Sequence, residues 1–511
     1  MIGARGYRAM FLVAAMFFAS AEIAEGAGKL LLNVVDAEAG RMLPFRLHLR
    51  TEKGVPVKLP KLPNWHDHAS VPGSVQLELF RGNYFFEIEH GPEFENATGY
   101  FTINDGADDE KTVTLKRAAD MPKEGWWSGD LDVRRPQREL ELTMQADDVH
   151  VVPLTTWSNR KSDWAKTPPP KQIVVSYGDD RFYHWLAGYE DRTGGPIGLY
   201  NLPRPASLPT LPKDLLPLVA PLKEWKAGNA GLWIDVAHPN AWDLPILLAF
   251  GLVDSYRVLP SYLQRDKVAF VPQGKPFDKT MYLGNEGPAR FAADVYFHIL
   301  NAGFRIPPSA GSGSGMAPNP LGYCRVYVQL EKGDVSYDAW WEGFRRGRAT
   351  VSNGPLIRPF ANRLPPGGQF SAAEGETVEL DMSMNLTTRD TIDYVEVIQN
   401  GRTAHSVRLR DWAKNGGHFP PTKFTESGWC LVQARCVLPK TYRATMSAPW
   451  YVVIGGRERV SKVSAQFFLD WLEERAGELK IADPAQKEAA EAVISEARAF
   501  WKQRLASANA P

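Results

Sequence analysis

Between residues 29 and 118, apolar and polar positions alternate in short runs separated by glycine-containing turns. The clearest runs are Lys29–Val35, Phe45–Arg50, Val75–Phe80 and Tyr84–Glu89. Successive side chains of a strand point to opposite faces, so this alternation predicts half-buried strands. No helical periodicity of useful length interrupts them. We therefore predict an N-terminal β-sandwich over residues 29–118.

From residue 124 to 360 the pattern changes to strand, loop and helix. Phe182–Ala187 and Leu232–Val236 are strand candidates, and Pro288–Ala302 carries apolar residues at helical spacing. Gly303 follows that helix as a stop signal. Alternation of strands and helices predicts an α/β domain with a mostly parallel sheet or barrel.

Strand patterning returns over residues 365–456, where we predict a second β-sandwich. Tyr394–Ile398 is followed by Asn400 and Gly401, a pair that readily adopts the positive φ angles of a tight hairpin turn. A helical tail follows over residues 460–507, with Asp483 as the expected N-cap of its second helix. The apolar stripe of this tail predicts a packing face against the body of the protein or a site for a partner helix.

The N-terminus has the pattern of an export signal over residues 1–21. Arg5 and Arg8 precede an apolar run, and the small residues Ala19-Ser20-Ala21 follow it. The run is too short to span a bilayer comfortably, and a buried first helix is the alternative. We expect an exported protein, periplasmic or secreted, with no membrane anchor.

Charge and cysteine content narrow the class of protein. The 59 Lys and Arg residues balance 59 Asp and Glu residues, so no net charge attracts nucleic acid. Of the three cysteines, Cys430 and Cys436 lie in one expected strand, roughly 20 Å apart at the rise of a strand. A disulfide cannot span that distance, so we expect these residues to be buried thiols.

Several segments of the middle region resemble the CehA/McbA-type metallohydrolases of the PHP (polymerase and histidinol phosphatase) superfamily. The segments are Gly125–Pro136, Ala146–Asn159, Leu186–Arg192, Val236–Pro239 and Asn301–Val328. The resemblance implies a distorted PHP-type (β/α) barrel over residues 124–360, flanked by the two β-sandwiches. It also implies a metal-dependent hydrolase of a phosphoester or related ester, using Zn, Mn or Mg.

The resemblance also assigns metal ligands, and most of the expected positions are substituted. Asp132 and Arg134 stand at the His-x-His positions of the first barrel strand, and Gly311–Gly315 replaces the closing Gly-Ser-Asp-x-His segment. Glu190 and His238 match ligand positions. Asp132, Glu190 and His238 are therefore the ligands that the resemblance leaves. A fixed guanidinium at position 134 opposes a dication, so the site is expected to bind metal weakly or not at all.

These substitutions favour a second function, a non-catalytic binding or scaffold protein that holds a small anionic or carbohydrate-like ligand in the barrel cleft. Its candidate binding residues are Asp130, Arg134, Trp127, Trp157, Ser312 and Ser314. An Arg in a cleft suits bidentate binding of a carboxylate or phosphate. Gly311–Gly315 is either a backbone-amide nest for an anion or a flexible connector. His238 and Glu190 are equally consistent with a buried loop histidine and a solvated turn.

A further candidate metal site lies in the N-terminal sandwich, at Trp65-His66-Asp67-His68. Residues two apart share one face of a strand, so His66 and His68 are placed to chelate one ion with Asp67 as a neighbour. The alternative is that these side chains serve only packing.

Overall fold

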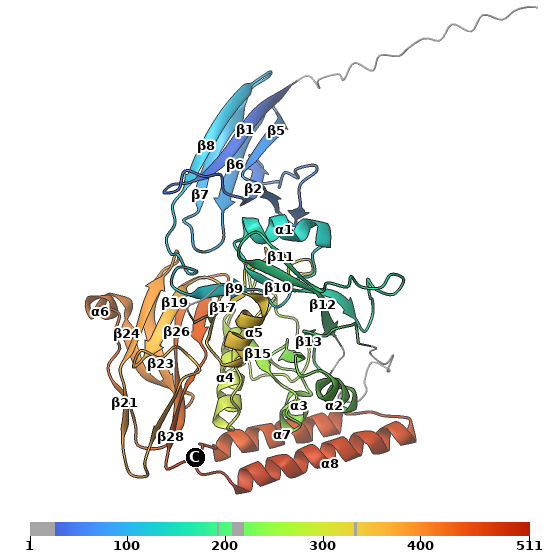
Figure 1. Ribbon diagram of the computed structural model, residues 1–511, viewed down its shortest axis with the longest axis vertical. Coiled ribbons are helices and arrows are strands. Elements are labelled where there is room, and N and C mark those ends of the chain that lie inside the picture. The colour runs from blue at the N-terminus through green and yellow to red at the C-terminus, as the bar shows by residue number, and fades with distance from the viewer. Residues whose placement is uncertain (1–25, 192–193, 207–218, 332–334) are drawn as a thin grey trace, which may run out of the picture.

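The computed structural model describes residues 26–191, 194–206, 219–331 and 335–511. They form a multidomain mixed α/β protein with several β-sheets and two long C-terminal helices (Figure 1). The N-terminal strands and the C-terminal helices lie at opposite ends of its long axis. The predicted export signal lies outside the described residues. Within them, no helix has the length and apolar character needed to cross a membrane.

The N-terminal region contains two sheets. In the first, β1 (Ala27–Asp36) lies between β5 (Ser74–Phe80) and β8 (Asp108–Leu115). The second sheet has the order β3 (Asn64–Trp65), β4 (His68–Val71), β2 (Phe45–Thr51), β6 (Gly82–Glu89) and β7 (Ala97–Ile103). Leu32, Phe45 and Ile88 belong to the buried apolar cluster of this region. The predicted strands therefore form, because their alternating apolar side chains share one core.

The central region is built on a curved sheet (Figure 1). Its strands, in spatial order, are β16 (Pro308–Ala310), β15 (Ser255–Leu259), β14 (Trp233–Val236), β13 (Ile197–Tyr200), β12 (Arg181–Glu190), β10 (Val151–Ser158) and β9 (Trp126–Gly129). Neighbours run parallel except at β13, which is antiparallel to both of its neighbours. The short strand β11 (Val174–Tyr177) pairs with β12.

Four helices accompany these strands. They are α1 (Gln137–Ala146), α2 (Val219–Gly228), α3 (Leu244–Ala249) and α4 (Gly287–Asn301). The described strands do not close into a barrel. Isolated parallel bridges instead join Val133 to Leu154 on one side and to Ser314 on the other.

The sheet does not stop at the predicted boundary near residue 360. From β9 it continues through β17 (Arg325–Gln329), β18 (Ala349–Ser352), β27 (Ala444–Ser447), β26 (Gly428–Cys436), β23 (Ile392–Gln399) and β24 (Arg402–Arg408). The antiparallel pairing of β18 with β27 makes this connection. The central and C-terminal regions therefore share one hydrogen-bonded sheet.

Smaller elements complete the C-terminal region. β28 (Trp450–Ile454) pairs with β26 and β20 (Gln369–Ala372), while β19 (Leu356–Ala361) pairs with β22 (Met382–Thr387) and β21 (Val378–Leu380) with β25 (Thr422–Phe424). The helix α6 (Leu409–Lys414) also belongs here, whereas α5 (Tyr337–Arg345) packs on the central region, where Trp340 and Phe344 join the central apolar cluster. Asn400 and Gly401 form the predicted hairpin turn with φ of 51° and 81°. Cys430 and Cys436 are buried and free, as expected.

The helical tail consists of α7 (Lys462–Glu478) and α8 (Pro484–Ala506), which lie side by side against the central region (Figure 1). Asp483 caps α8 by accepting a 2.8 Å hydrogen bond from the amide of Gln486. Phe468 and Trp501 join the central apolar cluster, and the Trp501 indole donates to the Pro245 carbonyl at 2.9 Å. The apolar stripe is thus a packing face.

Candidate functional site

A buried ion-pair network occupies the interior of the central sheet. Arg257, on β15 and 1% exposed, donates from Nη1 to Asp132 Oδ2 at 2.9 Å and from Nη2 to Asp235 Oδ2 at 2.6 Å. The same Nη2 donates to the Tyr200 hydroxyl at 2.9 Å. Burial lowers the pKa of Arg257, but the nearby carboxylates outweigh it and raise the pKa well above its usual value. The guanidinium therefore stays charged and holds two acidic side chains that no solvent reaches.

Asp130 is the anion bound by the Gly-Ser segment. Its carboxylate accepts hydrogen bonds from the amides of Asp132 at 3.0 Å, Ser312 at 3.0 Å and Gly322 at 2.7 Å, and from the Ser312 hydroxyl. Burial raises the pKa of Asp130 to about 6, and these hydrogen bonds limit the rise. Of the segment 311–315, Ser312 alone donates to this carboxylate, through its amide and its hydroxyl, and the other two amides come from Asp132 and Gly322, so the anion bound here is a side chain of the protein itself.

The glycines of this segment allow it to pack against the chain around Asp132. A Cβ atom on Gly311 would lie 2.6 Å from the Asp132 Cβ, and one on Gly315 would lie 2.4 Å from the Arg134 carbonyl oxygen. Ser314 accepts a 2.7 Å hydrogen bond from the Arg134 amide, and its own hydroxyl is buried without a partner. The segment 311–315 is therefore packed tightly against Asp132 and Arg134, and it is not a flexible connector.

Arg134 contacts the same segment through its backbone amide. Its Nε donates to Asp132 Oδ1 at 3.2 Å, and its guanidinium carbon lies 4.0 Å from the ring centroid of Tyr189. Burial lowers the pKa of Arg134, but Asp132 and Tyr189 more than compensate, so the pKa is raised. Its Nη2 is buried without a hydrogen-bond partner.

The three ligands implied by the resemblance are not gathered around one point. In the described parts of the chain, the group of three His, Cys, Asp or Glu side chains close enough to share an ion is a different one. Glu190 is buried at the end of β12. His238 faces the rings of Tyr262 and Phe270 at 5.9 and 6.2 Å, and burial lowers its pKa.

The two tryptophans predicted to bind a ligand have structural contacts. Trp157 is 3% exposed, belongs to the central apolar cluster and donates to the Leu186 carbonyl at 3.0 Å. Trp127 is half-buried, and its ring meets His150 edge-on at 4.9 Å. These contacts account for both side chains within the fold.

The group that meets the distance requirement for an ion is His48, Asp67 and His68. His48 Nδ1 lies 3.2 Å from Asp67 Oδ2, and His68 Nδ1 lies 3.4 Å from Asp67 Oδ1. Burial lowers the pKa of His48, and it lowers the pKa of His68 to about 3, so both imidazoles are neutral at pH 7. His66, which the sequence pairs with His68, has a side chain 56% exposed and lies 3.5 Å from Asp67. The structure therefore pairs His68 with His48 from the neighbouring strand.

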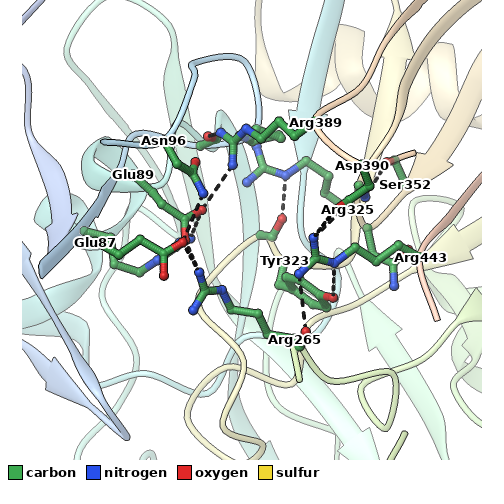
Figure 2. A pocket seen from close by; sticks show the side chains of 16 residues that line it. Glu87, Glu89, Asn96, Arg265, Tyr323, Arg325, Ser352, Arg389, Asp390 and Arg443 are labelled. Atoms are coloured by element: carbon green, nitrogen blue, oxygen red, sulfur yellow. Dashed lines mark hydrogen bonds and ion pairs between the residues drawn. The ribbon is translucent and has the colours of Figure 1, made fainter. Parts of the chain in front are cut away.

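A separate cavity of about 410 Å³ lies where the N-terminal, central and C-terminal regions meet (Figure 2). Five arginines and three carboxylates line it: Arg46, Arg265, Arg325, Arg389 and Arg443, with Glu87, Glu89 and Asp390. Glu89 forms ion pairs with three of these guanidiniums, those of Arg46 at 2.7 Å, Arg265 at 2.8 Å and Arg389 at 3.2 Å. Positive charge therefore exceeds negative charge on the cavity wall.

Two of these guanidinium groups, those of Arg325 and Arg265, can still pair with an anionic ligand. Arg325 is 3% exposed and donates to the backbone carbonyls of Gly322, Asp147 and Asp148, without a carboxylate partner among the described residues. Arg265 contacts Glu87 and Glu89 through Nη2 alone, and its side chain is 25% exposed. Its Nε and Nη1 remain available to a ligand.

Comparison with known proteins does not identify a relative. No family model and no curated protein matches the chain. Among solved structures, the Bacillus anthracis TIE protein matches 21% of this chain, and 19% of its own length, at 18% identity and a TM-score of 0.15. The N-terminal four Ig domains of Dscam1 isoform 4.44 match 84% of this chain and 73% of that chain at 7% identity and a TM-score of 0.14. Apo Bacteroides uniformis beta-glucuronidase 3 matches 84% of this chain and 63% of its own chain at 9% identity and a TM-score of 0.18. These scores are too low to assign a fold.

Sequence reasoning did not find Arg257, Asp235, His48 or the arginines of the cavity. Arg257 and Asp235 do have a local signal, because each is a charged residue inside an otherwise apolar strand, which indicates a buried partner. The arginines of the cavity come from segments far apart in the chain, and no local pattern connects them.

Proposed function

We propose that this protein binds a small anionic, hydroxylated ligand, such as a sugar acid or sugar phosphate, in the arginine-lined cavity. The observation that carries the proposal is the excess of guanidinium groups over carboxylates around a cavity of about 410 Å³. Guanidinium groups bind carboxylates and phosphates through paired hydrogen bonds, and a cavity of this size suits a small molecule. Asn96 and the Arg265 side chain, which is 25% exposed, add donors for hydroxyl groups.

The resemblance to PHP-type metallohydrolases remains a proposal for the fold. The two parallel bridges of Val133 support it, because the segment after β9 lies between the middle of β10 and the segment after β16, an arrangement compatible with a distorted barrel. For the chemistry, the Arg257 guanidinium between Asp132 and Asp235 supports the binding protein, since a fixed cation there opposes a metal ion. We also propose export, on the N-terminal sequence pattern.

Binding is tested by calorimetric titration with glucuronate and glucose 6-phosphate, with neutral glucose as the matched ligand. We expect both anions to bind, and Arg265→Gln to weaken them by at least about tenfold, the effect of one lost charge-assisted pair. Arg81→Gln is the control variant, since the Arg81 side chain is 71% exposed and pairs with Asp105. Equal affinity for glucose and the anions, or an unchanged affinity in Arg265→Gln, would contradict the proposal.

The hydrolase is tested with a phosphodiester and a phosphomonoester substrate in the presence of Mn²⁺ or Zn²⁺. We expect no turnover by the wild-type protein. Metal-dependent turnover that disappears in Glu190→Ala would replace the binding proposal with the enzyme.

A further inference from the structure

The strand register of the N-terminal sheet brings two histidines to one place. β2 and β4 are antiparallel, and Arg46 pairs with Ser70 and Leu47 with Ala69. The next position in this register sets His48 opposite His68, with ring centroids 5.1 Å apart. Trp65 pairs with His68 across a two-residue turn, which places Asp67 beside both rings.

The ligand atoms of His48, Asp67 and His68 all lie within 4.8 Å of one another, so small side-chain movements can gather them around one Zn²⁺ ion. Ligands about 2.0–2.1 Å from Zn²⁺ in tetrahedral geometry lie about 3.3 Å apart. Asp67 Oδ2 lies 3.2 Å from His48 Nδ1, and Asp67 Oδ1 lies 3.4 Å from His68 Nδ1. His66 Nδ1 lies 3.5 Å from Asp67 Oδ1, but His66 is not part of the group whose ligand atoms all lie within 4.8 Å of one another.

A buried nitrogen in the group has no hydrogen-bond partner. His48 is 3% exposed, and its Nδ1 lies 3.2 Å from Asp67 Oδ2 without a well-formed hydrogen bond to any residue in the described parts of the chain. Leaving a buried polar atom without a partner costs about 1–3 kcal/mol. A metal ion coordinated by this nitrogen removes that cost.

Neighbouring side chains act on this group at two points. Arg46 and Glu89 lie beside Nε2 of His48, and Arg50 competes with a metal ion for Asp67. Nε2 accepts a 3.2 Å hydrogen bond from Arg46, and Glu89 Oε1 lies 3.9 Å from it. In the structure Nδ1 therefore carries the ring proton. Coordination through Nδ1 moves that proton to Nε2, so Arg46 has to release this nitrogen and Glu89 accepts its hydrogen bond instead, in a carboxylate–histidine–metal arrangement. Arg50 donates to Asp67 Oδ2 at 2.6 Å, but its side chain is 45% exposed and free to move to solvent.

We propose that His48, Asp67 and His68 form a zinc-binding site, with a water molecule completing the tetrahedron. This site is separate from the ion-pair network of the central sheet but adjoins the arginine-lined cavity, because Arg46 and Glu89 line that cavity and contact His48. Its imidazole and carboxylate donors suit Zn²⁺ better than Mg²⁺ or Ca²⁺.

The test is calorimetric titration of the chelator-treated full chain with Zn²⁺, followed by Co²⁺ titration monitored by visible absorption. We expect one equivalent of Zn²⁺ to bind and Co²⁺ to give the intense absorption of a tetrahedral complex. Asp67→Asn and His68→Gln should each weaken Zn²⁺ by about 100-fold or more, since even outer partners of a metal site contribute 10–100-fold.

His418→Gln is the matched control, because His418 also contacts an Asp, Asp381, at 3.0 Å, with a side chain 48% exposed. Zn²⁺ affinity should be unchanged in this variant. Should the buried substitutions unfold the protein, the wild-type Co²⁺ spectrum decides alone. Failure to bind a full equivalent of Zn²⁺, an octahedral Co²⁺ spectrum, or equal affinity in folded Asp67→Asn would overturn the proposal.

Discussion

Arg257 is the ion-pair partner of two carboxylates that lie inside the protein. Asp132 is 1% exposed and Asp235 is fully buried, and both use Arg257 as an ion-pair partner. Ser255 and Ser309 supply further hydrogen bonds to Asp235. A buried ion pair stabilises little by itself, but removing one partner exposes the full cost of a buried, uncompensated charge.

Replacement of Arg257 by Met should therefore destabilise the protein by about 3–5 kcal/mol, because Asp235 stays buried and loses its guanidinium partner, while Asp132 keeps only its pair with Arg134. Urea denaturation measures the loss. Arg410→Met is the control, with a side chain 72% exposed, and should change stability by less than about 0.5 kcal/mol. A loss for Arg257→Met no larger than that of the control would show that the two carboxylates are not held as described.

Glu93 makes a second residue-scale prediction, on pH. It is fully buried, accepts hydrogen bonds from the Met121 amide at 2.9 Å and the Tyr327 hydroxyl at 3.2 Å, and burial raises its pKa to about 8 from 4.5. A raised folded-state pKa means that the folded protein binds the extra proton. Stability from this group is therefore fully present below pH 4.5 and lost as pH rises through 8.

Glu93→Gln removes this titration and keeps the shape of the side chain. Its free energy of unfolding should fall less between pH 5 and pH 8 than that of the wild type, with each pKa unit worth about 1.4 kcal/mol. Urea midpoints at several pH values provide the measurement. Parallel pH profiles for the two proteins would mean that Glu93 is charged in the folded state.

At the scale of elements, the segment 311–315 depends on close approach to the chain after β9. Gly311 has no positive φ, yet an added Cβ would lie 2.6 Å from the Asp132 Cβ and 3.2 Å from the Arg257 guanidinium carbon. Only the absence of a side chain permits this packing.

Gly311→Ala should thus cost about 1–3 kcal/mol from overpacking alone. The matched variant is Gly228→Ala, where a Cβ meets nothing within 4 Å and the backbone lies at the end of α2. That change should be neutral or stabilise by up to about 1 kcal/mol, since Gly is a poor helix residue. Thermal melting of both variants checks the comparison, and equal effects would contradict the packing account.

Elements with a strong local signal could be predicted from the sequence. The four strands predicted at residues 29–35, 45–50, 75–80 and 84–89, the turn at Asn400 and Gly401, the cap at Asp483 and the helix predicted from Pro288 all appear, whereas β3, β4 and β7 were not predicted. Each of the predicted elements depends on the residue's own conformational preference or on a single apolar face. The reversed direction of β13 and the continuation of the sheet through β18 and β27 depend on pairing between distant strands, which periodicity does not encode.

The candidate sites were harder to predict for the same reason. The sequence predicted a metal or ligand site around Asp132. The cation that pairs with Asp132, however, belongs to Arg257, 125 residues further along the chain. His68 was identified as a ligand, while its partner His48 lies on another strand. A single sequence locates chemical groups along the chain, and strand register decides which of them meet.

At the scale of the whole molecule, Arg389 connects the C-terminal region to the N-terminal sheets. Its Nη1 donates to Glu89 at 3.2 Å, and its Nη2 donates to the carbonyls of Gly91 and Phe94. Arg265 connects the central region to Glu87 and Glu89 in the same way. The arginines that line the cavity therefore also hold the three regions together.

Arg389→Ala should loosen this junction, at a cost of about 1–3 kcal/mol for the lost hydrogen bonds to a charged group. In scanning calorimetry we expect the N-terminal sheets to melt earlier than the rest of the protein. Arg81→Ala, which changes an exposed arginine within the N-terminal region, should leave the melting profile unchanged. A wild-type profile for Arg389→Ala would show that the regions are joined by other contacts.

The positive charge between Asp132 and Asp235 belongs to an amino-acid side chain. It cannot dissociate on dilution, exchange for a competing ion or be extracted by a chelator. The buried ion-pair network of the central sheet therefore keeps its shape where metal ions are scarce or are removed by competing chelators, conditions under which a metal site would lose its ion.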